Sequence, residues 1–297
     1  MSSVSSNKPF ILLFLVFAVK HAGILQSLYA APQPAPSPEF FVFDNGVGRG
    51  EWAPEKQAQI LKQLGAEGIS YNLTTKEALA HWQRAFKDAG LKIYGLYVHT
   101  WVDQPERQRY QAELREAIQI LKGSDTVIWM TLRSRENKRE GLDAQAVENV
   151  RQVAAWAAEA GLDVAIYPHA GFYVETAEDA LRISGQTNLP NVGASFNLCH
   201  DLIKGNADRL DEVIAKTAPH CRLISINGAD MPSKHTLRLD QGTLDLTALL
   251  NKIRAAGYDG PVGLQCYSVP GDNEENLKAS IEAWKSIRQN LAKETQQ

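Results

Sequence analysis

Cysteine is scarce in this sequence: only Cys199, Cys221 and Cys266 occur among 297 residues. None of them forms a CxxC pair, so neither a zinc ribbon nor a dithiol redox motif is indicated. The odd number would leave at least one thiol unpaired even where disulfides form. We expect all three to behave as small, partly buried apolar residues.

An excess of positive charge is also missing. Lys and Arg number 31 against 34 Asp and Glu, a net charge of −3. The N-terminal segment contains two basic residues, Lys8 and Lys20, and no acidic residue. The rest of the chain therefore carries 29 basic and 34 acidic side chains. Because nucleic-acid binders usually present a basic stripe to phosphates, no nucleic-acid partner is expected. Apolar residues make up 44%, enough for a large core.

No apolar run is long enough to span a membrane. The longest, residues 10–19, would cover about 15 Å as a helix, half of a hydrocarbon core of ~30 Å. A lysine precedes this run and two alanines follow it, which is typical of a secretory signal peptide. The sequence predicts a signal peptide over 1–31, a Pro-rich linker over 32–39, and export to the periplasm or the extracellular space, without stable membrane insertion after cleavage. The alternative is an uncleaved anchor.

A glycine-rich phosphate turn is absent as well, because residues 44–52 (DNGVGRGEW) contain no GxGxxG. This argues against an open dinucleotide-binding sheet. From residue 40 onwards, strand-like apolar runs alternate with amphipathic helices such as 54–65 and 144–161, several of which end at a glycine. The predicted strands are 40–45, 68–72, 91–99, 126–133, 162–169, 192–200, 222–230 and 261–267.

Eight strands buried on both faces and separated by helices are typical of parallel pairing with right-handed crossovers. Roughly 265 residues remain after the N-terminal segment, which is close to the usual size of one α/β barrel. We therefore predict a single (β/α)₈ TIM barrel over residues 40–292, without a second domain.

Polar residues follow the predicted strands, and in such a barrel they point into one mouth. Neutral amides, imidazoles and phenols dominate, with Trp52, Trp101, Trp129 and Tyr173 expected nearby, so a polyhydroxylated ligand is favoured. For any single asparagine, capping of the next helix is the simpler explanation. The strand-end residues are Asp44, Asn45, Asn72, His99, Arg133, Tyr167, His169, Asn197, His200, Asn227, Asp230, Gln265 and Tyr267.

Four segments carry a resemblance to a known family: YPHAGFYVE (167–175), NVGASFNLCHDL (191–202), ISINGAD (224–230) and GPVGLQCY (260–267). With them, residues 40–290 resemble the sugar phosphate isomerase/epimerase superfamily of xylose isomerase-like TIM barrels, which includes the endonuclease IV type of repair enzyme. The resemblance implies a divalent metal, often manganese, held by Glu, Asp, His and Glu at the ends of strands five to eight. It also implies that the two Glu move protons on the sugar.

This chain departs from that pattern at each ligand position, where it has Tyr167, Asn197, Asn227 and Gln265. A hard cation needs anionic oxygens or imidazoles, and a carboxamide is no general base, so the metal-assisted mechanism is not expected. No cofactor is therefore predicted. A weaker Mn, Mg or Zn site at His169 and His200, with Asp230 or Asp44, is the alternative.

Two functions remain for a small carbohydrate partner. The first is a sugar isomerase, epimerase or related lyase acting on a neutral sugar or keto-sugar by proton transfer. His169 or His200 would be its general acid/base, with Asp44, Asp230 or Tyr167 as partner group. Hydroxyls and an enediolate-like oxygen would be held by Asn72, His99, Arg133, Asn197, Asn227, Gln265 and Tyr267.

The second function is a carbohydrate-binding barrel that has lost catalysis, as the neutral residues at the ligand positions would allow. An apurinic-site endonuclease is disfavoured, because its cluster of metal ligands is missing. If a phosphate is recognised, Arg133 and Lys234 are the candidates.

Overall fold

The computed structural model describes residues 38–136, 140–231 and 235–294, and these form one body. The predicted signal peptide, residues 32–37 of the predicted linker, and Lys234 lie outside the described residues. Within the described ranges, no helix combines the length and the apolar character that a membrane crossing requires.

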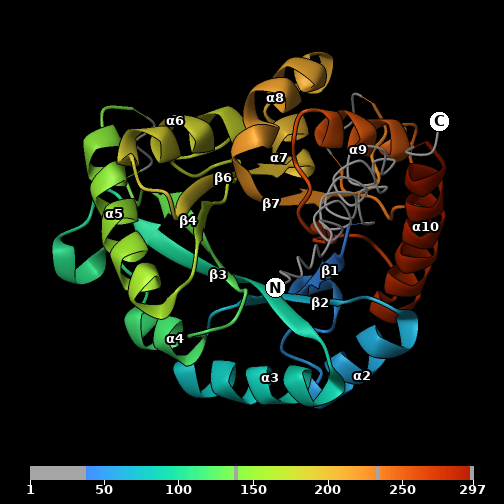
Figure 1. Cartoon of the computed structure of the whole chain (residues 1–297), viewed down its shortest axis with the longest axis horizontal. Helices are drawn as coiled ribbons and strands as arrows, with labels where there is room; N and C mark the ends of the chain where they lie inside the picture. Colours follow the sequence, from blue (N-terminus) through green and yellow to red (C-terminus); the bar gives the residue numbers. More distant parts are fainter. Residues whose placement is uncertain (1–37, 137–139, 232–234, 295–297) are drawn as a thin grey trace, which may run out of the picture. The chain divides into compact units, whose positions relative to one another are not determined.

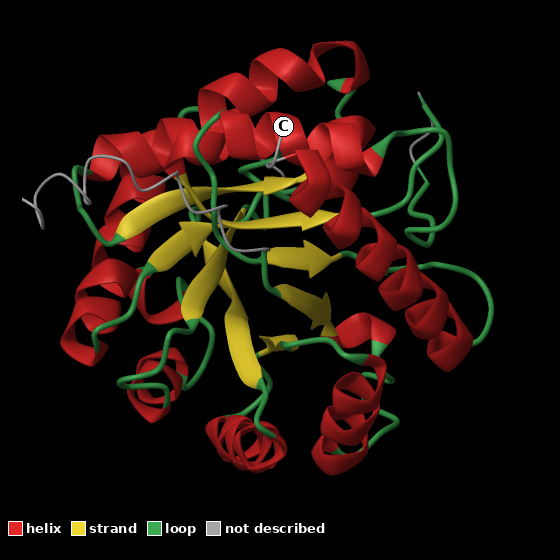
Figure 2. Ribbon diagram, turned by 45° about the vertical axis from the view of Figure 1, so that its right-hand side comes forward, coloured by secondary structure: helices red, strands yellow, loops and turns green. Residues whose placement is uncertain are grey.

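Eight parallel strands form a closed barrel in chain order, so the predicted (β/α)₈ TIM barrel is confirmed. The ring closes where β8 pairs with β1, with Phe41 opposite Gly263. A side chain at Gly263 would collide with the Phe41 ring, so the closure needs glycine there. Figures 1 and 2 show the strands in the middle and the helices around them. The strands are β1 Phe40–Phe43, β2 Gly68–Asn72, β3 Lys92–Trp101, β4 Val127–Arg133, β5 Val164–Ile166, β6 Val192–Asn197, β7 Cys221–Ile226 and β8 Val262–Leu264.

The helices surround the barrel and bury one face each against it. Gly65, Gly90 and Gly161 end α2, α3 and α5 with φ of 90°, 73° and 74°, the left-handed conformation that glycine adopts most easily. The helices are α2 Pro54–Leu64, α3 Lys76–Ala89, α4 Leu114–Ile120, α5 Asp143–Ala160, α6 Ala177–Thr187, α7 Leu198–Ile203, α8 Leu210–Thr217, α9 Leu246–Ala255 and α10 Asn273–Glu294.

Several strands are shorter than predicted, and this frees their last residues for the mouth. The strand predicted over 162–169 ends at Ile166, because Pro168 has no backbone N–H with which to continue the ladder. Tyr167 and His169 therefore lie in the loop that follows. The strand predicted over 261–267 likewise ends at Leu264, one residue before Gln265.

An aromatic cluster fills the barrel interior below the mouth. Trp129 is fully buried there, and its Nε1 donates to Ser195 Oγ at 2.6 Å. The expectation that Trp129 and Tyr173 stand beside a ligand is therefore wrong: Tyr173 is buried as well, and its hydroxyl donates to Asp143. Trp129 instead packs edge-on against the Tyr167 ring, with centroids 4.8 Å apart, and so supports the floor of the site.

Candidate functional site

A cavity of about 880 Å³ opens at the C-terminal ends of the strands. Most of the predicted site residues converge on it, although they come from all eight strands or the loops after them. Those that line the cavity are Asp44, Asn45, Asn72, His99, Arg133, Tyr167, His169, His200, Asp230, Gln265 and Tyr267. Asp230 and Tyr267 are exposed at the rim, and the others lie deeper.

Asn197 and Asn227 are fully buried and do not line the cavity. Asn197 caps the N-terminus of α7: its Oδ1 accepts from the backbone N–H of His200 at 3.2 Å. Asn227 donates from Nδ2 to the Gly228 carbonyl at 2.8 Å, and its Oδ1 has no hydrogen-bond partner. Neither can touch a ligand directly, so their influence must pass through neighbouring groups.

The hydroxyl oxygen of Tyr167 is the centre of a polar cluster in the cavity floor. Asn197 Nδ2 donates to it at 2.7 Å and Gln265 Nε2 at 3.1 Å. Both amides have a fixed orientation, because a backbone N–H bonds the oxygen of each: His200 to Asn197, and Tyr267 to Gln265 at 3.0 Å. A backbone N–H can only donate, so both amide nitrogens must face the phenol.

His200 contributes a third group to the same oxygen. Its Nδ1 accepts from the backbone N–H of Ala170 at 3.3 Å, so the neutral ring carries its proton on Nε2, 3.4 Å from Tyr167 Oη. Burial lowers the pKa of His200 to about 3, with the His169 ring adding to the effect, so the ring is neutral at ordinary pH. Three N–H groups therefore surround one phenol oxygen, and the contact from His200 is the longest of the three.

Tyr167 itself stays a protonated phenol. Burial raises its pKa well above the ordinary value, although the hydrogen bond from Gln265 opposes this. The two amide donors occupy its acceptor capacity, so the hydroxyl proton is left to point toward the cavity. Hydrogen bonds received by a hydroxyl polarise it and strengthen the one it donates. This makes Tyr167 a suitable donor to a ligand oxygen that gains negative charge.

His99 and His169 carry their ring proton on Nδ1, whereas His200 carries it on Nε2. Thr131 Oγ1 donates to the Val98 carbonyl, so it accepts from His99 Nδ1 at 2.9 Å; His169 Nδ1 donates to the Ala170 carbonyl at 2.8 Å. Each neutral ring thus has a bare Nε2, which accepts a hydrogen bond or a proton. Burial lowers the pKa of both, that of His99 to about 4.

Asp44 lies in the cavity wall and is paired with Arg49, a residue that the sequence reasoning missed. Arg49 Nε donates to Asp44 Oδ1 at 2.8 Å, and the backbone N–H of Asn72 donates to Oδ2 at 2.9 Å. Burial raises the pKa of Asp44, and Arg49 opposes that effect. The sequence prediction covered residues at strand ends only. It did not include Arg49, because this residue lies farther along the loop after β1.

Tyr97 and Phe172 also line the cavity and were missed. Tyr97 could have been found, because on β3 it lies two residues before His99 and so shares its face. Phe172 had no comparable signal. Its ring stacks on His169 with centroids 3.9 Å apart, in the loop between β5 and α6.

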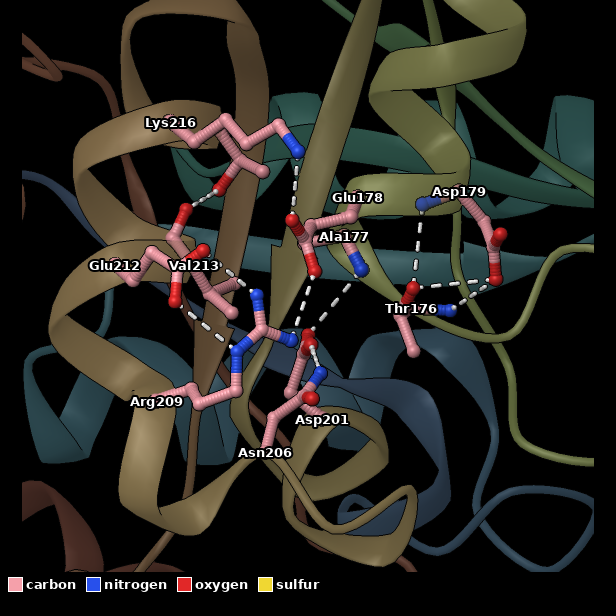
Figure 3. A network of polar contacts seen from close by, with 11 residues as sticks. Thr176, Ala177, Glu178, Asp179, Asp201, Asn206, Arg209, Glu212, Val213 and Lys216 are labelled. Carbon is pink, nitrogen blue, oxygen red and sulfur yellow. Dashed lines mark hydrogen bonds and ion pairs between the residues drawn. The ribbon is translucent and has the colours of Figure 1, made fainter.

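The residue that follows His200 is anchored by hydrogen bonds, which Figure 3 shows from close by. Asp201, the next residue, is fully buried; its carboxylate accepts from the backbone N–H of Ala177 at 3.3 Å and from Asn206 Nδ2 at 2.8 Å. These bonds join α7 to the first turn of α6. Burial raises the pKa of Asp201 to about 7.

The residues at the four positions where the resemblance predicts metal ligands do not fit a divalent cation. Tyr167 places its oxygen among the amide nitrogens of Asn197 and Gln265, which are donors and would repel a cation. His169 and His200 offer little more, because of their four ring nitrogens only His169 Nε2 is not engaged in a described contact. No group of three or more His, Cys, Asp or Glu in the described ranges could hold a metal ion.

Fold and site together define a TIM barrel with a cavity lined by polar side chains in its mouth. The family model of the xylose isomerase-like TIM barrel matches residues 58–287, and the chain belongs to this family. At the sequence level, no curated protein matches it.

Solved structures with this fold include 3-keto-D-glucoside 4-epimerase, YcjR, from E. coli: 17% identity, TM-score 0.67, covering 85% of this chain and 99% of that one. IOLI protein with a binding zinc atom has 16% identity and a TM-score of 0.66 over 85% of this chain and 98% of the other. A xylose isomerase-like TIM barrel/4-hydroxyphenylpyruvate dioxygenase fusion protein shares 15% identity, with a TM-score of 0.66 over 86% of this chain. This chain spans only 43% of the fusion protein.

Proposed function

We propose that this protein is an exported sugar isomerase or epimerase that moves a proton on a small keto-sugar without a bound metal. The observation that carries the proposal is the pairing of two bare imidazole nitrogens, on His99 and His169, with the polarised hydroxyl of Tyr167 in one cavity. The similar fold of a 3-keto-D-glucoside 4-epimerase supports the substrate class. The apolar run at residues 10–19 supports export.

The proposed reaction starts when one imidazole Nε2 removes the proton from the carbon beside the ketone. The electrons of the broken C–H bond move to the carbonyl oxygen, which becomes an enolate oxygen and receives a hydrogen bond from Tyr167. The imidazolium, or the other histidine after it has been protonated, returns a proton to carbon and regenerates the ketone. Asn197, Gln265 and His200 hold the phenol in place, so here we assign His200 a positioning role and His99 a catalytic one.

A carbohydrate-binding barrel without catalysis remains the second candidate. The lowered pKa values of His99 and His169 favour it, because a weaker base removes a carbon-bound proton more slowly.

Deuterium exchange separates the two candidates. Purified protein is incubated in D₂O with a panel of 3-keto-glycosides and ketoses, with and without EDTA, while calorimetry measures binding. We expect deuterium to enter at the carbon beside the ketone, at the same rate after EDTA treatment. Binding without exchange would establish the binding barrel, and exchange that stops with EDTA and returns with Mn²⁺ would refute the metal-free mechanism.

The lowered pKa values also predict the pH dependence. His99 and His169 act in the neutral form, so kcat/KM should fall only as the pH drops through their folded-state pKa values, that of His99 being about 4. The acid limb of the pH profile should therefore lie below the ordinary histidine range near 6.5. A limb centred at 6.5 or above, measured with the same substrate, would contradict the assignment.

A further inference from the structure

Arg133 is the one charged group deep in the cavity wall that has no partner of opposite charge within the described ranges. It ends β4 and is half-buried. Its guanidinium lies 4.4 Å from the centroid of the Phe172 ring and 5.9 Å from that of Trp101. No hydrogen bond or ion pair connects it to any described residue, although a guanidinium carries five N–H donors.

The other charges in the wall do not neutralise Arg133. Asp44 is committed to Arg49 and to the backbone of Asn72. Asp230 lies at the exposed rim after β7, three strands away around the barrel, where water can solvate it. The neighbouring imidazoles are neutral, and Arg133 itself contributes to the lowered pKa of His99.

The aromatic contacts hold the guanidinium in place. Phe172 contacts both Arg133 and His169, the latter in a parallel stack at 3.9 Å, so one ring fixes a cation beside a proposed base. A planar guanidinium that is already oriented loses little entropy when it binds, and its fork matches a carboxylate or a phosphate with two hydrogen bonds. A neutral hydroxyl would leave the charge uncompensated.

We propose that the cavity selects sugars that carry an anionic group, a carboxylate or a phosphate, and that this group pairs with Arg133. The proposal rests on the proposed function only in using the same cavity. An anion held at Arg133 leaves the rest of the sugar to reach His99 and His169, since the His99 ring lies 6.4 Å and the His169 ring 3.9 Å from Phe172. The charged end would thus fix which carbon faces the bases.

Calorimetric titration with three probes tests this directly: glucose, glucuronate and glucose 6-phosphate. One of the two anionic sugars should bind roughly 10- to 100-fold more tightly than glucose, and which of them does so separates carboxylate from phosphate recognition. Salt should weaken this binding. Equal binding of all three, or no binding of the anionic sugars at millimolar concentration, would overturn the proposal.

Variants test whether the Arg133 side chain causes the preference for an anionic sugar. Arg133→Met should abolish the preference for the anionic sugar, whereas Arg133→Lys should retain part of it. Arg135→Met is the matched control, because Arg135 also lies over the Trp101 ring, at 4.8 Å, but does not line the cavity. The Arg135→Met variant should prefer the anionic sugar as strongly as the wild type does. A preference that survives in Arg133→Met would refute the proposal. Because these are binding measurements, a failure of the deuterium exchange would count against the catalytic proposal alone.

Discussion

Replacing Tyr167 with Phe should lower kcat for deuterium exchange by about 10²- to 10³-fold, the usual cost of removing one hydrogen-bond donor from a developing oxyanion. The substitution deletes only the hydroxyl on which Asn197 and Gln265 converge. The ring would remain packed between Trp129 and Tyr97, so the fold should be kept. Exchange kinetics under saturating substrate, with thermal unfolding of the same sample, measure both effects.

Tyr94→Phe provides the matched control. Tyr94 belongs to the same aromatic cluster but lies at the opposite end of the barrel, where its hydroxyl donates to Glu39 at 2.8 Å. Losing that hydroxyl should leave kcat unchanged. Gln265→Glu removes one donor and keeps the acceptor for the Tyr267 N–H, so it should lower kcat by a smaller factor. Wild-type kcat in Tyr167→Phe would rule out the oxyanion role.

The architecture could be predicted from sequence because each unit of the barrel repeats the same local signals. An apolar run of strand length follows an amphipathic helix, and glycines such as Gly90 and Gly161 mark where the helix must stop. The last residue of each strand was harder to predict from the sequence. Pro168 was visible in the sequence, but whether Tyr167 pairs in the sheet or turns into the mouth depends on its neighbours in space.

The residues that line the mouth were likewise predictable from the sequence. The directions in which their hydrogen-bond donors and acceptors point were not. The pattern of strand ends identified thirteen residues, and eleven of them do converge on one cavity. Which face of an amide meets the phenol depends on single backbone N–H groups, those of His200 and Tyr267, and no sequence pattern reports their position. The same holds for the tautomers of the histidines, which the carbonyl of Ala170 and the hydroxyl of Thr131 determine.

Three of the four residues predicted to replace the family's metal ligands form one hydrogen-bonded set. An amide in place of a carboxylate at position 197 or 265 would only weaken a metal site, but with a phenol at position 167 both amides gain an oxygen to which they donate. The cluster therefore presents a hydrogen-bond donor where the resemblance predicts a metal ion. Both arrangements can stabilise an enolate oxygen.

The stability difference between wild type and Asp201→Asn is expected to depend strongly on pH. Burial raises the folded-state pKa of Asp201 to about 7, against 3.8 as its ordinary value. The protonated carboxyl is therefore favoured in the folded state; its contribution is fully present below pH 3.8 and is lost as the pH rises through about 7. Wild type should lose on the order of 4 kcal/mol of unfolding free energy relative to Asp201→Asn between these limits.

Denaturant unfolding at pH 5 and pH 8 should show about 2.7 kcal/mol of this difference, because about 2 of the roughly 3 pH units over which it develops lie above pH 5. The comparison cancels the opposite contributions of the buried histidines that both proteins share. Asparagine has the same shape, can accept from Ala177, and only needs the Asn206 amide to turn over. Asp211→Asn on α8 is the control, because that carboxylate is exposed and pairs with Lys252 at the surface; its effect should be small and independent of pH. An Asp201→Asn difference that is equal at both pH values would mean that the carboxylate is ionised in the folded protein, with Ala177 and Asn206 stabilising the charge.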